Sequence, residues 1–215
     1  MNMLQYPSRL ALVLLFAVAM AMVEAAGVAY LRSLYYPEGF TIILKAISRQ
    51  HMMIEIGREI ATLVMLGTVA GLAGRERWER FGWFLTLFGV WDIFYYAWLK
   101  VTIDWPLALT EWDILFLIPA PLVGPVIAPV LVSIVMVIVG LSITRLYRRR
   151  VRFRPTATTW WVAIAATAMI LYTFLRDAGR INRGEYPEPY WYSLLIVGLA
   201  LYLFAFWWSY RQADE

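Results

Sequence analysis

Six long stretches of the sequence are almost free of charge, and each is long enough to cross a lipid bilayer. A helix needs about 20 consecutive apolar residues to span a hydrocarbon core of roughly 30 Å. The stretches cover residues 10–31, 53–74, 81–103, 123–146, 159–176 and 191–208. In the whole chain 62% of the residues are hydrophobic and 16% are charged, against about 45–50% and about 25% in soluble domains. The sequence therefore predicts an all-α integral membrane protein, with residues 1–215 forming one six-helix transmembrane domain.

The first stretch also has features of a cleaved secretory signal. Arg9 precedes the apolar run, and Val23-Glu24-Ala25 fits the small-residue pattern of a cleavage site. We nevertheless expect this stretch to be retained as a membrane helix.

Basic residues follow the second and fourth stretches. They are Arg75, Arg77 and Arg80 after the second, and Arg145, Arg148, Arg149, Arg150, Arg152 and Arg154 after the fourth. Loops rich in arginine lie on the cytoplasmic side of membrane proteins. The loop between the third and fourth stretches is acidic instead, with Asp104, Glu111 and Asp113. We therefore expect an inner (cytoplasmic) membrane protein with both termini in the cytoplasm, although Arg180 and Arg183 in the last outer loop weaken the pattern.

Two outer connections look structured, and we expect short interfacial helices there. Residues 37–49 place Ile42 and other apolar residues opposite charged ones, as in a helix lying on the membrane surface. Thr110-Glu111-Trp112-Asp113 has the form of a helix capping box before residues 114–118. The prolines that follow are Pro119, Pro121, Pro125 and Pro129. They predict either a kinked start of the fourth helix or a re-entrant loop.

Several ionisable residues lie inside the expected spans, where charge is costly and usually functional. They are Glu24, Glu55, Arg58, Glu59 and Asp92, with Arg176 and Asp177 at the end of the fifth span. A rise of about 1.5 Å per residue places the acids roughly 18–22 Å from the cytoplasmic ends of their helices. The charges of four helices are thus expected to form one layer in the outer half of the membrane.

The second span presents its polar residues on one face. Residues His51, Glu55, Arg58, Glu59 and Thr62 follow the spacing of a single helical face. Gly67, Gly71 and Gly74 lie on a largely different face. Because small residues let membrane helices approach closely, we expect this helix to pack against a neighbour through its glycines.

This layer predicts a site that binds a metal ion or another cation. Carboxylates and an imidazole suit a divalent or iron-type metal, and the expected ligands are Glu24, His51, Glu55, Glu59 and Asp92. We expect Arg58, Asp92, Tyr95 and Arg176 to contact or orient a bound cofactor. Two alternatives stay open. Arg58 and Arg176 could form purely structural ion pairs with the acids, or one carboxylate could exchange a proton or cation with the outer face.

The composition narrows the function without naming a reaction. The chain has no cysteine and one histidine, which excludes thiolate-ligated cofactors and bis-histidine haem. Common nucleotide-binding and hydrolase motifs are missing from the sequence. The partners we expect are the lipid bilayer and other subunits of a membrane complex, and not nucleic acid. The preferred function is cation binding linked to membrane redox chemistry; the alternatives are a noncatalytic accessory subunit and a proton-coupled carrier of small solutes.

Overall fold

The computed structural model describes residues 5–42, 48–118, 120–151, 153 and 155–214. In these ranges six helices are long and apolar enough to cross a membrane. They are α1 (Tyr6–Tyr35), α2 (Arg49–Ala73), α3 (Arg77–Ile103), α4 (Ile127–Arg148), α5 (Ala157–Leu175), which α6 (Ala178–Asn182) extends, and α7 (Tyr192–Asp214). The predicted all-α six-helix membrane bundle is confirmed, and each helix overlaps its expected span.

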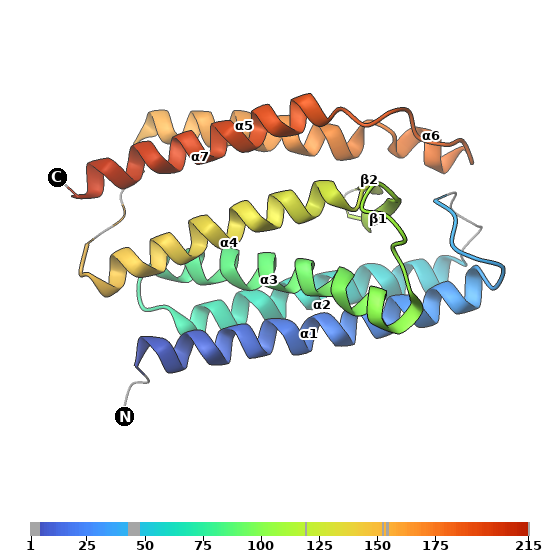
Figure 1. The fold of residues 1–215 in the computed structure, drawn as a ribbon, viewed down its shortest axis with the longest axis horizontal. Coiled ribbons are helices and arrows are strands. Elements are labelled where there is room, and N and C mark those ends of the chain that lie inside the picture. The colour runs from blue at the N-terminus through green and yellow to red at the C-terminus, as the bar shows by residue number, and fades with distance from the viewer. Residues whose placement is uncertain (1–4, 43–47, 119, 152, 154, 215) are drawn as a thin grey trace.

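The helices are arranged around α3. Helices α1, α2 and α4 all pack against α3, and α5 and α7 form a pair that lies over α4 (Figure 1). The core at the centre includes Trp83 and Leu87 of α3, Ala17 of α1 and Leu66 of α2, all without exposed surface. Both ends of the described chain lie at the same end of the bundle, as an even number of crossings requires.

Glycines bring α3 and α4 into close contact. A methyl group at Gly89 would lie 2.5 Å from the carbonyl oxygen of Ser133, and one at Gly140 would lie 2.5 Å from that of Gly82. The expectation that α2 packs through its glycines was wrong for Gly67 and Gly71, where a methyl group would meet no described neighbouring element within 4 Å, whereas one at Gly74, just after α2, would lie 2.6 Å from the backbone nitrogen of Arg80 in α3. The buried face of α2 consists instead of Glu59, Thr62, Leu66, Ala70 and Ala73. The polar face and the packing face of α2 therefore overlap.

We expect Gly140→Ala to destabilise the bundle by about 1–3 kcal/mol, the usual cost of overpacking a tight contact. The new methyl group would meet the backbone of Gly82 and Thr86, which no side-chain rotation can move. Denaturant titration in mixed micelles measures the free energy of unfolding. Gly67→Ala is the matched control, because the site is open and alanine stabilises a helix relative to glycine. Equal stability of the two variants would contradict the close α3–α4 contact.

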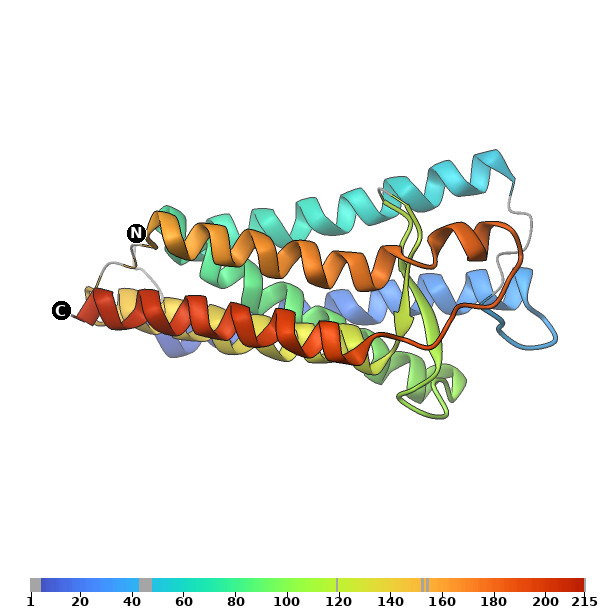
Figure 2. The ribbon, with the colours of Figure 1, turned by 90° about the horizontal axis from the view of Figure 1, so that it is seen from above.

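A β-hairpin stands where a short helix was expected after Thr110. Strands β1 (Trp112–Phe116) and β2 (Leu122–Pro125) are antiparallel, with Ile114 opposite Val123. The capping-box prediction was wrong because Asp113, which would close the box with Thr110, lies in β1 and pairs with Arg32 (2.9 Å). Aromatic and branched residues such as those of β1 favour strands, and pairing satisfies backbone groups that lipid cannot. The hairpin runs across the helices (Figure 2).

The hairpin also changes the start of the fourth span. Helix α4 begins at Ile127, not near residue 123, because β2 occupies residues 122–125. Pro129 lies in the first turn of α4, where the missing amide donor breaks no helical hydrogen bond. Pro119 lies outside the described residues, as do residues 43–47 of the expected interfacial helix over 37–49. A short helix is found at α6, after the fifth span.

Candidate functional site

A polar pocket lies between the hairpin and helices α1, α2 and α3, toward the end of the bundle away from the termini. Its volume is about 130 Å³. The predicted site residues in its wall are Glu24 of α1, His51, Glu55, Arg58 and Glu59 of α2, and Asp92 and Tyr95 of α3. The structure thus brings together seven of the eight residues predicted from the sequence. The exception is Arg176, which lies elsewhere.

Arg58 links two of the carboxylates. Its guanidinium group forms ion pairs with Glu24 across the α1–α2 contact and with Glu55 one turn earlier on α2. The hydroxyl group of Thr62 donates a further hydrogen bond to Glu24 (3.0 Å). The side chain of Arg58 is 27% exposed, whereas that of Glu24 is 8% exposed. Arg58 therefore neutralises part of the acidic wall from within the protein, as the ion-pair alternative predicted.

Glu59 faces the hairpin and is only 4% exposed. Its Oε1 atom accepts a hydrogen bond from the backbone amide of Leu117 (2.8 Å), at the end of β1. Its Oε2 atom is buried and has no hydrogen-bond partner among the described residues. A buried polar atom without a partner is rare in native proteins. Asp113 Oδ2, in the same wall, is a second buried oxygen without a hydrogen-bond partner among the described residues, so the pocket contains two free acceptors that a ligand could satisfy.

Asp92 is a second carboxylate without a basic partner in the described part of the chain. It is 8% exposed and accepts a hydrogen bond from the hydroxyl group of Ser133 on α4 (2.8 Å). Ser133 lies where Gly89 lets α3 and α4 approach. The glycine contact thus positions the hydroxyl group that donates to Asp92.

Arg32 and Asp113, which were not predicted as site residues, form a buried ion pair. Arg32 Nη2 lies 2.9 Å from Asp113 Oδ1, and Asp113 is 2% exposed. The guanidinium carbon of Arg32 lies 3.9 Å and 3.7 Å from the ring centroids of Phe40 and Trp105. Burial raises the pKa of Asp113, while the charge of Arg32 and the amide of Ile114 lower it. This pair fastens the hairpin to the C-terminal end of α1.

A signal for Arg32 was present in the sequence. Arg32 lies eight residues after Glu24 and therefore on the same helical face, although it falls just beyond the expected span. Asp113 gave a weaker signal, because it was assigned to an outer loop and used only to orient the chain. An acid within the apolar run Trp112–Phe116 could have suggested a buried partner.

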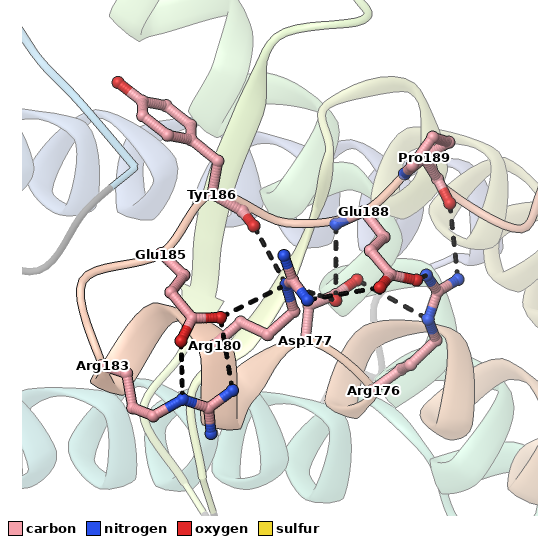
Figure 3. A network of polar contacts seen from close by, with 8 residues as sticks. All are labelled: Arg176, Asp177, Arg180, Arg183, Glu185, Tyr186, Glu188 and Pro189. Atoms are coloured by element: carbon pink, nitrogen blue, oxygen red, sulfur yellow. Dashed lines mark hydrogen bonds and ion pairs between the residues drawn. The ribbon is translucent and has the colours of Figure 1, made fainter.

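Arg176 belongs to a separate polar network around α6 (Figure 3). It pairs with Glu188 (2.7 Å), and Arg180 also pairs with Glu188 (3.2 Å) and lies 3.9 Å from Asp177. Arg183 pairs with Glu185 (2.8 Å). The network joins the ends of α5 and α6 to the segment before α7. It therefore holds the connection between α5 and α7 together and contributes no residue to the pocket.

His51 is an exposed residue of the pocket wall. It is in the first turn of α2, where the hydroxyl group of Ser48 accepts a hydrogen bond from its amide (3.2 Å). Its ring Nδ1 contacts the hydroxyl group of Tyr35, the last residue of α1. Both side chains also line the pocket.

The wall has more acidic than basic groups. Five carboxylates, those of Glu24, Glu55, Glu59, Asp92 and Asp113, share the pocket with the guanidinium groups of Arg32 and Arg58. Within the described residues no three histidine, aspartate or glutamate side chains form a group that could hold a metal ion. The metal role predicted for Glu24, His51, Glu55, Glu59 and Asp92 stays a prediction. Comparison of the chain with protein-family models, curated proteins and solved structures gives no match.

Proposed function

We propose that this pocket binds a cation, either a metal ion or an organic one. The observation that carries the proposal is the imbalance of charge, five carboxylates against two guanidinium groups in one pocket. Arg32 forms an ion pair with Asp113, and Arg58 forms ion pairs with Glu24 and Glu55. Glu59 and Asp92 have no basic partner among the described residues. Unpaired buried carboxylates are costly, and a bound cation would offset that cost.

The proposed direction of access is from the outer face of the membrane. The arginine-rich loops follow α2 and α4, at the end of the bundle that carries the termini. The positive-inside rule assigns that end to the cytoplasm. The pocket then lies in the outer half of the bilayer, with His51 and Tyr35 toward the outer aqueous phase.

Calorimetric titration of the purified protein in detergent tests the proposal. The probes are the chlorides of magnesium, manganese and n-butylammonium, at constant ionic strength. We expect at least one of them to bind, and Glu59→Gln to weaken that binding by about tenfold or more, the equivalent of about 1.4 kcal/mol. Asp92→Asn should act in the same direction if Glu59→Gln misfolds.

The matched control is Glu188→Gln, which removes a carboxylate from the network around α6 and leaves the pocket unchanged. The proposal fails if none of the three cations binds, or if Glu188→Gln weakens binding as much as Glu59→Gln. Uptake of the bound cation into liposomes, driven by a proton gradient, would identify a carrier. Copurification with a fixed set of membrane proteins would instead identify an accessory subunit.

A further inference from the structure

We infer that the ligand of this pocket is a small protonated amine, a ligand class that deepens the proposed function and rests on it. The first reason is the free Oε2 atom of Glu59, which is buried and has no partner among the described residues. A carboxylate oxygen accepts hydrogen bonds and does not donate them. The missing partner is therefore a donor, and an ammonium N–H group supplies both the hydrogen bond and the opposite charge.

The second reason is the aromatic part of the wall. Seven phenylalanine, tyrosine and tryptophan rings line the same pocket, those of Tyr35, Tyr36, Phe40, Trp91, Tyr95, Tyr96 and Phe116. The rings of Trp91 and Tyr95 stack with centroids 6.4 Å apart, and Tyr95 contacts Tyr96 with centroids 4.9 Å apart. Aromatic faces attract organic cations within about 6 Å, whereas hard metal ions prefer oxygen ligands alone. This wall fits an alkylammonium ion, whose carbon atoms contact the rings.

The third reason is that the pocket already holds an organic cation in the same manner. The guanidinium group of Arg32 lies between the rings of Phe40 and Trp105 and pairs with Asp113. One cation, two rings and one carboxylate thus form a complete recognition unit at one side of the pocket. Glu59, with Trp91 and Tyr95 in the same wall, provides a second carboxylate with rings, and the neighbouring Arg58 forms its ion pairs with Glu24 and Glu55 and not with Glu59.

The size of the pocket limits the ligand. A volume of about 130 Å³ is slightly less than that of a cavity of about 150 Å³ that holds benzene. The ligand therefore has about six non-hydrogen atoms or fewer. A simple alkylammonium group resembles that of lysine, with a pKa of about 10.4, so it carries its charge at neutral pH.

Three ligands, each with five non-hydrogen atoms, distinguish the contribution of charge to binding from that of hydrogen bonding. n-Butylammonium has charge and N–H donors, tetramethylammonium has charge without N–H donors, and n-butanol has no charge. In calorimetric titration of the wild-type protein we expect n-butylammonium to bind at least about tenfold more tightly than tetramethylammonium, and n-butanol not to bind. Equal binding of n-butylammonium and tetramethylammonium would overturn the inference, as would binding of n-butanol.

Two variants of α3 test the aromatic wall. Tyr95→Leu removes a ring that lines the pocket and should weaken n-butylammonium binding by about three- to thirtyfold, the range of a cation–π contact. Phe94→Leu removes the neighbouring ring, which is 39% exposed and outside the pocket wall, and should leave binding unchanged. Equal losses in the two variants would overturn the aromatic role.

The test separates this inference from the proposed function. If magnesium or manganese binds in a Glu59-dependent way and n-butylammonium does not bind, the inference of an amine ligand is wrong, whereas the proposal of cation binding stands. If none of these cations binds, both fail. If n-butylammonium binds equally to the wild type and to a folded Glu59→Gln variant, the site lies elsewhere and the inference is overturned.

Discussion

Replacing Arg32 with methionine is expected to lower the free energy of unfolding by about 3–5 kcal/mol, the usual cost of breaking a buried ion pair from one side. The substitution leaves Asp113 buried without its cation, and it removes the guanidinium group from between Phe40 and Trp105. Because the pair connects α1 to the hairpin, the hairpin should also lose protection. Denaturant titration in mixed micelles measures the first effect, and amide hydrogen exchange over β1 measures the second.

Lys100→Met provides the matched control for this prediction. Lys100 pairs with Asp104 at 2.7 Å, but the two side chains are 48% and 80% exposed. Exposed ion pairs contribute at most about 1 kcal/mol, so the control should be close to the wild type. The double substitution Arg32→Met with Asp113→Leu should recover part of the loss, because it removes both buried charges. Equal losses for Arg32→Met and Lys100→Met would contradict the structural role of the buried pair.

Replacing Arg58 with methionine is expected to tighten cation binding by about tenfold or more, while making the ligand-free protein less stable by about 3–5 kcal/mol. Arg58 is the internal cation that Glu24 and Glu55 share. Its removal leaves those carboxylates unpaired and adds to the negative charge of the pocket. Titration with the cation that binds the wild type measures the first effect, and unfolding with and without that cation measures the second.

This variant has the opposite expected sign to the carboxylate variants, which makes it diagnostic. Arg145→Met is the control, since Arg145 is exposed in the last turn of α4, near the other end of the bundle. It should change neither affinity nor stability. A pocket that binds an anion would instead lose its ligand in Arg58→Met, and that result would refute cation binding.

The apolar runs predicted most of the fold, because the membrane imposes a length and a composition on every spanning helix. The helical rise per residue predicted that Glu24, Glu59 and Asp92 lie at one height in the membrane. The structure places all three in one pocket. Height was predictable since it depends only on distance along a helix. The identity of neighbouring helices could not be predicted in this way, because it depends on the contacts between the helices.

The hairpin was the main failure of the sequence analysis. Thr110-Glu111-Trp112-Asp113 satisfies a local rule for helix starts, but the strand at Trp112–Phe116 is stabilised by its pairing with residues 122–125 and by Leu117 against Glu59. Those contacts are distant in sequence and outweigh local preference. Contacts that are distant along the chain also explain why the prediction for Arg176 failed. Its expected height matched the layer of charges, but its side chain pairs with Glu188.

The free energy of unfolding at increasing cation concentration tests the central claim most directly, because a ligand stabilises the state that it binds. At a concentration of about 100 times the Kd, the gain is about 2.7 kcal/mol. The account predicts this gain for n-butylammonium chloride or a divalent metal chloride with the wild type, and a much smaller gain with Glu59→Gln. No gain with any of these cations, or an equal gain in both proteins, would contradict a cation-binding pocket at Glu59.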